Sequence, residues 1–305
     1  MFKEIVSNEA AKSFLQNELG MNRASGTYLF YGEDEALNFK FALAFAKGLN
    51  CPEMENDFCG VCEICKRIEH LTYGDLEILE DSGGIKIDRV RELIYNAAIT
   101  SYEGRKKIYI LKGIEKMKKE SSNALLKLIE EPEEGSFFIL LSNSLNLLPT
   151  IKSRSIILKI DRLNAQELGI SEKEYKFFLG NTEKIENYLK IKSQIDFEMG
   201  APYDEIGTYI KELKKTGEFQ YKINIYKSIR DFIRNKGYLD ELDKIFFAEE
   251  ILRGGADREL VKEIVVYTLH LSKSPKSMEE NLILKGMLKF PINLKNFLIT
   301  FFSKI

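Results

Sequence analysis

The chain has 305 residues, with 45 lysine and arginine residues against 47 aspartate and glutamate residues, so its formal net charge at pH 7 is -2. This balance excludes the strongly basic field with which a protein binds nucleic acid on its own, so DNA contact would need a local patch or other chains that supply the charge. Hydrophobic residues make up 44% of the chain, an ordinary share for globular proteins, and the length suits two or three domains.

We expect neither a membrane span nor a secretory signal. The N-terminus, Met1-Phe2-Lys3-Glu4, begins no apolar run of signal-peptide length. The most apolar stretch, residues 137–148, is interrupted by two serines and two asparagines and therefore cannot span a bilayer. The predicted localisation is cytoplasmic, without membrane contact.

The first 160 residues alternate between strand and helix patterns. A β-rich run over 27–31 ends at Gly32, and a helical pattern follows over 36–49. The later segments are a strand over 76–79, a helix over 88–97 with Asp88 as its N-cap, a strand over 107–111, a helix over 121–131 that Pro132 stops, a strand over 137–141 and a short strand near 156–160. This alternation predicts an α/β fold, a parallel sheet with helices on both faces.

The residues from 161 onwards have helical periodicity almost throughout. Breaks are expected at 200–202, at Gly254-Gly255 and at Ser274-Pro275. The pattern predicts a small connecting piece over 161–191 and a helical bundle after it.

All four cysteines of the chain lie within 15 residues in the spacing C-x7-C-x2-C-x2-C: Cys51, Cys59, Cys62 and Cys65. The two short steps bring three sulfur atoms together, Cys51 can fold back as the fourth, and Gly60 allows the turn between them. Four thiolates in a tetrahedral shell suit structural zinc and leave no open position for a substrate. Two disulfides are one alternative, disfavoured without an export signal, and an iron–sulfur cluster with unusual spacing is another.

The turn after the first strand is where a phosphate-binding loop would lie. Such a loop reads G-x-x-x-x-G-K-[ST], because glycine amides wrap the phosphates, the lysine neutralises them and the hydroxyl holds magnesium. Counted from Gly32, the second glycine position holds Leu37. The lysine position holds Asn38 and the hydroxyl position holds Phe39, while three acidic residues at 33–35 would repel phosphates. We predict a degenerate site that binds no ATP; the alternative is that Gly32 is only a turn.

The strand over 107–111 supports the same interpretation. Carboxylates that hold magnesium should follow it, but the next residues are Lys112-Gly113-Ile114-Glu115, with no aspartate at the end of the strand. Two independent parts of an ATP site are therefore missing.

The order of the segments resembles the delta-prime subunit family of the bacterial DNA polymerase III clamp loader, within the AAA+ superfamily. The matching stretches are 29–32 (Leu-Phe-Tyr-Gly), 42–47, the cysteine run 51–65, 85–93, 102–106, 123–132, 148–151 and 153–155 (Ser-Arg-Ser). The resemblance covers residues 1–160 and extends to the rest only in its helical character.

The resemblance implies an AAA+ like domain over 1–160 with a zinc module at 51–65 as an insertion. It also implies a short helical lid over 161–191 and an all-α collar domain over 192–305. The four cysteines fall on the family's zinc ligands. The family's trans-acting arginine lies in a Ser-Arg-Cys motif, which Ser153-Arg154-Ser155 matches with serine in place of cysteine. Arg154 is therefore expected to stabilise charge on the transferred phosphate in a neighbouring subunit.

The function implied by the resemblance is that of a non-catalytic subunit of the complex that loads the sliding clamp on primed DNA for replication. This complex is part of the DNA polymerase III holoenzyme. The implied partners are motor subunits of the gamma/tau type and the delta subunit, with the sliding clamp and primer-template DNA as indirect ones. Outside the motif, Arg154 would be taken for a solvated loop arginine.

Two other functions stay open. The motor ATPase subunit of the same complex also carries a four-cysteine insertion, but it needs an intact phosphate loop. A zinc-containing DNA-binding module would need basic residues near the cysteines, and the local ones are Lys66, Arg67, Arg105, Lys106 and Lys107.

Overall fold

The computed structural model describes residues 1–81, 83–97, 101–103, 106–272 and 292–305. The chain divides into two compact units, Met1–Ile185 and Glu186–Ile305. The division falls within the segment 161–191 that was predicted to connect the domains, so most of this segment belongs with the first unit. Arg105 and the predicted break at Ser274-Pro275 lie outside the described residues.

A five-stranded parallel sheet forms the centre of the first unit, in the order β2-β3-β4-β1-β5. The strands are β1 (Gly26–Tyr31), β2 (Leu76–Leu79), β3 (Lys107–Lys112), β4 (Ser136–Ser142) and β5 (Ile156–Lys159). All seven residues of β4 are buried, because the strand is central and both faces of the sheet are covered. The predicted fold class is confirmed, and each predicted strand ends within one residue of the observed one.

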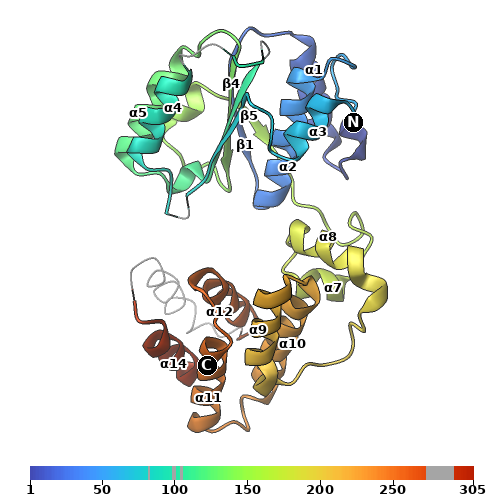
Figure 1. Cartoon of the computed structure of the whole chain (residues 1–305), viewed down its shortest axis with the longest axis vertical. Coiled ribbons are helices and arrows are strands. Elements are labelled where there is room, and N and C mark those ends of the chain that lie inside the picture. Colours follow the sequence, from blue (N-terminus) through green and yellow to red (C-terminus); the bar gives the residue numbers. More distant parts are fainter. Residues whose placement is uncertain (82, 98–100, 104–105, 273–291) are drawn as a thin grey trace. The chain divides into compact units, whose positions relative to one another are not determined.

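Helices cover both faces of this sheet (Figure 1). One face carries α4 (Ile87–Ala97) and α5 (Lys119–Glu130), and the other carries α1 (Glu9–Gly20), α2 (Glu35–Asn50) and α3 (Glu63–Glu69). Short helices α6 (Pro149–Ser153) and α7 (Glu172–Phe177) complete the unit, and α8 (Thr182–Ile191) crosses its boundary. The prediction for Asp88 was wrong in detail: it lies in the first turn of α4, where an acidic side chain still favours the helix dipole.

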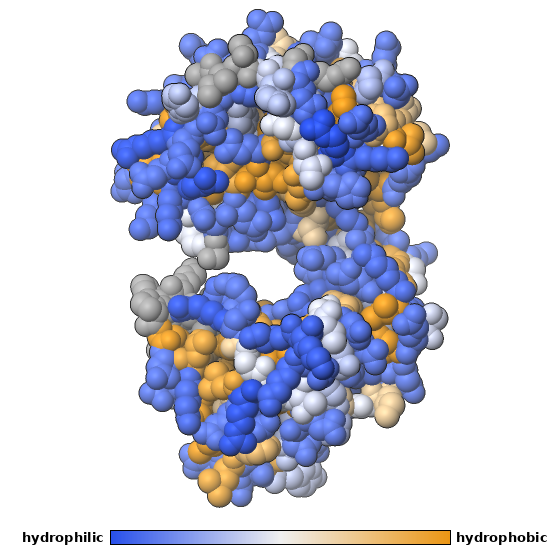
Figure 2. Space-filling view, viewed as in Figure 1, coloured by the Kyte–Doolittle hydropathy of each residue, from blue (hydrophilic) through white to orange (hydrophobic). Residues whose placement is uncertain are grey.

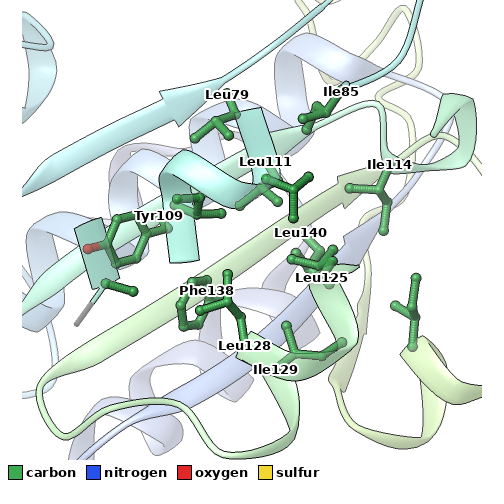
Figure 3. Packing of buried hydrophobic residues seen from close by; sticks show 14 of the residues in the cluster. Leu79, Ile85, Tyr109, Leu111, Ile114, Leu125, Leu128, Ile129, Phe138 and Leu140 are labelled. Atoms are coloured by element: carbon green, nitrogen blue, oxygen red, sulfur yellow. The ribbon is translucent and has the colours of Figure 1, made fainter. Parts of the chain in front are cut away.

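Two apolar layers hold the sheet between its helices. Under α4 and α5, the rings of Tyr109 and Phe138 stack with centroids 5.0 Å apart, among the leucine and isoleucine side chains labelled in Figure 3. On the opposite face, the ring of Tyr28 packs edge-on against that of Phe45 at 4.7 Å. Alternate residues of β1 and β4 therefore supply the two cores, as the pleat of a doubly covered sheet requires.

The secondary structure in the described part of the second unit is helical, with two short 3-10 turns (Lys192–Gln194 and Tyr203–Glu205) and α-helices. After α8 these comprise α9 (Ile206–Thr216), α10 (Phe219–Asn235), α11 (Glu241–Arg253), α12 (Arg258–Ser272) and α14 (Leu294–Lys304). Its core includes the stacked rings of Phe232 and Phe247, 4.1 Å apart, with Phe302 edge-on to both. On the face of each unit shown in Figure 2, hydrophilic residues lie between the hydrophobic areas. Among the residues described in either unit, no helix has the length and apolar character to span a membrane.

Gly32 allows two strand ends to approach closely. A Cβ atom at this position would lie 2.2 Å from the carbonyl oxygen of Ile160, so the backbone would have to shift. We expect Gly32→Ala to lower the free energy of unfolding by about 1–3 kcal/mol. Urea unfolding should show no such loss for Gly237→Ala, because a Cβ atom there meets open space. Equal stability of the two variants would contradict the prediction.

Candidate functional site

The structure brings the four predicted cysteines together. Cys51 directly follows α2, Cys62 is the N-cap of α3, and Cys65 lies inside α3. The four Sγ atoms all lie within 4.8 Å of one another, and those of Cys59 and Cys65 are 4.0 Å apart. A tetrahedral zinc shell with Zn–S bonds of about 2.3 Å has sulfur–sulfur edges of about 3.8 Å. The cluster is therefore compact enough to hold one metal ion with a closed shell of sulfur donors.

Backbone amides point at these sulfur atoms. The N–H groups of Cys59, Cys62 and Cys65 donate to the Sγ atoms of Cys51, Cys59 and Cys62 at 3.4, 3.3 and 3.4 Å. The amide of Cys62 is the main reason why the pKa of Cys59 is lowered to about 7, whereas burial raises the pKa of Cys65. Gly60 has a φ of 73°, as the predicted turn requires. The amides favour thiolates, the form that binds metal.

A carboxylate of the chain itself caps the N-terminus of α2, where a phosphate would bind. Asp34 Oδ1 accepts hydrogen bonds from the N–H groups of Ala36 and Leu37, both at 3.1 Å. Its Oδ2 accepts from the N–H group of Thr182, the first residue of α8, at 2.9 Å. Asp34 is only 6% exposed. These amides are the donors that a helix N-terminus offers to an anion, and here they are already used.

The residues at the other phosphate-loop positions have structural partners. Asn38 is buried, and its Nδ2 donates to the carbonyl oxygens of Gly32 at 2.8 Å and Ser142 at 3.3 Å. Phe39 lies under the ammonium of Lys112, 4.8 Å from its ring centroid. A cavity beside Asn38, lined by α2 and the ends of β3 and β4, measures about 40 Å³. The enclosed part of this cavity has room for a few water molecules.

Two of the three acidic residues after Gly32 form ion pairs within the chain. Glu33 lies 3.7 Å from Arg162, and Glu35 pairs with Lys116 at 3.1 Å. At the end of β3, Glu115 Oε2 accepts from the hydroxyl of Ser142 at 3.0 Å. These bonds stabilise the loops around the predicted site without any bound ligand.

Arg154 lies on the surface directly after α6, and one side of its guanidinium is bound by an acidic residue. Its NH2 group pairs with Glu130, the last residue of α5. Its NH1 group donates to the carbonyl oxygen of Thr150 at 3.2 Å and lies 3.5 Å from the hydroxyl of Ser153. The Ser155 hydroxyl, in place of the motif's cysteine thiol, donates to the carbonyl of Ile151 at 2.8 Å. Arg154 is therefore accessible, with 34% of its side chain exposed, but it is not a free loop arginine.

The predicted residues do not form one site. The cysteines, the residues around Gly32 and Arg154 occupy three separate places in the first unit, each with its own set of partners. Sequence reasoning missed Thr182 and Glu130. Asp34 could have been predicted as an N-cap, since it precedes a helical pattern. No local signal could have paired Arg154 with a residue 24 positions earlier.

Comparisons with known proteins show which family this chain resembles. A family model described as "DNA polymerase III, delta subunit" matches residues 7–164. DNA polymerase III subunit tau of Escherichia coli (strain K12) is 32% identical over 169 residues, which cover 55% of this chain and 26% of that protein. DNA polymerase III subunit delta' of Bacillus subtilis (strain 168) is 34% identical over 142 residues, which cover 46% of this chain and 43% of the relative. The chain thus matches less than half of the length of either relative.

A solved structure resembles the chain over nearly its whole length. A DNA polymerase III gamma subunit-related protein from Thermotoga maritima superposes with a TM-score of 0.63, covering 96% of this chain and 98% of that one. The two sequences are 14% identical, so the likeness concerns the fold.

Proposed function

The chain belongs to the family of clamp-loader subunits described as DNA polymerase III, delta subunit, and from this premise we propose that it is a non-catalytic member of its complex. Its fold is of the AAA+ type, with a parallel sheet between two layers of helices. In the proposed complex it binds no ATP and presents Arg154 to the ATP site of a neighbouring subunit. The complex loads a sliding clamp on primed DNA during replication.

The capped N-terminus of α2 is the observation that carries this proposal. A motor subunit needs free amides, a lysine and a hydroxyl at this place. Here the Asp34 carboxylate already accepts hydrogen bonds from the free amides of α2, and the lysine and hydroxyl positions hold Asn38 and Phe39. A phosphate would have to displace a buried carboxylate and then lie beside it without a neutralising lysine. The motor ATPase alternative is therefore disfavoured.

The proposed partners are motor subunits of the gamma/tau type and a delta subunit, with the clamp and primer-template DNA contacted through the complex. We assign residues 1–160 to the AAA+ like domain, 161–191 to a short lid and 192–305 to the collar. Asn8 supports the lid assignment, because its side chain exchanges two hydrogen bonds with the backbone of Asp161, at 2.9 and 2.8 Å. This contact supports an attachment of the first lid residue to the sheet domain.

We assign a structural zinc ion (Zn²⁺) to the four cysteines. Four thiolates around one Zn²⁺ carry a net charge of about -2. Residues 51–65 also contain Glu53, Glu55, Asp57 and Glu63 but no lysine or arginine. Arg67, just outside, is occupied by both carboxylate oxygens of Glu103, at 2.7 and 2.9 Å. Lys66, directly after the last cysteine, is exposed, but a single cation of this kind among the acidic groups attracts DNA only weakly, so the DNA-binding alternative is disfavoured.

Titration of the isolated chain with a fluorescent ATP analogue and Mg²⁺ tests the nucleotide half of the proposal. We expect no saturable binding up to millimolar nucleotide, whereas a gamma/tau-type subunit measured in parallel should bind it. Micromolar affinity of the isolated chain would contradict the proposal and favour the motor ATPase.

Asp34→Ala should lower the free energy of unfolding by about 1 kcal/mol, because α2 loses its N-cap. It should not create ATP binding in the same titration.

A further inference from the structure

We propose that Glu130 competes for Arg154 with the nucleotide bound by the neighbouring subunit. The guanidinium of Arg154 then stays paired with Glu130 until the neighbouring ATP site closes around it. The inference rests on the proposed function, because it concerns how Arg154 is delivered in trans. Glu130 is then a positioning residue: it contacts neither nucleotide nor reacting atoms, and it acts only through the guanidinium of Arg154.

The backbone around both partners is fixed by the core. Ile129, next to Glu130, is 2% exposed, and Ile151, in the helix that Arg154 follows, is 1% exposed. Both belong to the apolar cluster under α4 and α5. Because α5 and α6 are anchored in the same core, the carboxylate and the guanidinium face each other from rigid supports. Their pairing is therefore a feature of the fold and not of a mobile loop.

The pair is arranged so that it can be exchanged. The side chains of Arg154 and Glu130 are 34% and 47% exposed, so water reaches both. Exposed ion pairs of this kind are weak, whereas an arginine that reaches a phosphate in a closed, dry site forms strong charge-assisted hydrogen bonds. The NH2 group that binds Glu130 is one of the donors that a phosphate would need. Glu130 can thus bind Arg154 while the interface with the neighbouring subunit is open and release it when that interface closes.

The surrounding charges strengthen the restraint on Arg154. Glu130 begins an acidic run that continues through Glu131, Glu133 and Glu134, interrupted only by Pro132. Glu130 also lies at the C-terminus of α5, where the helix dipole is negative and favours a cation such as Arg154. Both effects stabilise the guanidinium where it is and oppose an approaching phosphate.

The test uses Glu130→Gln in the reconstituted complex with a gamma/tau-type subunit. The substitution keeps the shape of the side chain and removes its charge, so we expect DNA-independent ATP turnover to rise roughly two- to fivefold, the range that an exposed ion pair supports. The rise should be in kcat with KM unchanged, because Arg154 acts on the transferred phosphate. Glu131→Gln is the matched control: it removes the same charge one residue later but breaks no ion pair among the described residues, so it should raise turnover less than Glu130→Gln does.

A double variant separates this inference from the proposed function. If Glu130 acts only through Arg154, Glu130→Gln combined with Arg154→Ala should turn over ATP at the rate of Arg154→Ala alone. An unchanged or lowered rate in Glu130→Gln, or an equal rise in Glu131→Gln, overturns the inference while the role of Arg154 stands. If Arg154→Ala itself has no effect, the proposed function fails first.

A second measurement tests the ion pair directly. In the isolated chain, the NMR signal of the Arg154 guanidinium should shift in Glu130→Gln; an unchanged signal overturns the pairing.

Discussion

Replacing Arg154 by alanine should lower ATP turnover at the neighbouring site by about a thousandfold and leave the complex assembled. Arginines that act in trans on a transferred phosphate contribute about that much to kcat, because they neutralise charge that develops in the transition state. Arg154 is partly exposed, and its own contacts are one ion pair and two bonds within its turn. Removing its side chain therefore leaves the core under α6 unchanged, and folding should not suffer.

The measurement reconstitutes the chain with a gamma/tau-type subunit and follows DNA-stimulated ATP hydrolysis, with gel filtration to check assembly. Total turnover should fall by the share of the one site that Arg154 serves. Lys152→Ala is the matched control, since it removes a cation from the same short helix. Within the part of the chain that the structure describes, the Lys152 ammonium contacts only the carbonyl of Leu145, at 3.4 Å. Arg154→Lys should restore little activity, because lysine lacks the planar fork of donors. Full turnover by Arg154→Ala would remove Arg154 from the mechanism.

Loss of the metal should have the second large effect, on stability. Binding of structural zinc supplies about 10–16 kcal/mol in small zinc-finger peptides, and that free energy becomes folding free energy of the segment that holds the ion. Within residues 51–69 only Phe58, Cys65 and Ile68 are buried, so packing alone cannot replace the metal. We expect Cys65→Ser to unfold residues 51–69 while the sheet stays folded.

Elemental analysis should find one zinc ion per wild-type chain and none in Cys65→Ser. Limited proteolysis should then cut the variant, or the chelated wild type, within 51–69. Glu63→Gln, on the same helix, should keep both the metal and the resistance to protease. Bound iron would refute the assignment to zinc, and a Cys65→Ser chain that resists protease would refute the structural role of the site.

The sheet could be predicted from the sequence because its signals are local. Each strand is a short apolar run bounded by polar residues or glycine, and each such run ends where hydrogen bonding in the sheet ends. The cysteine cluster was predicted for the same reason, since its four ligands lie within one short segment. Boundaries between compact units were less predictable, because the segment 161–191 reads as one helical stretch and the contacts divide it.

The contacts that give the candidate site its character are distant in sequence. Asp34 is bonded to the amide of Thr182, 148 residues away, and Arg154 is paired across two helices with Glu130. Such pairs depend on how the strands are ordered in the sheet, and no periodicity encodes them. The sequence therefore pointed to the residues around Gly32 and to Arg154 as candidates, but not to the groups that hold them.

The bonds of Asp34 and Asn38 also bear on how this protein could evolve. A phosphate loop at this place would require glycine at position 37, lysine at 38, a hydroxyl at 39 and loss of the carboxylate at 34. Changes at two of these positions remove native interactions. Changing Asp34 uncaps α2 and leaves the amide of Thr182 without its acceptor, and changing Asn38 leaves the carbonyl oxygens of Gly32 and Ser142 without their amide donor. Under the proposed function, changes at Asp34 or Asn38 towards a phosphate loop would therefore lower stability before they gave any ATP binding.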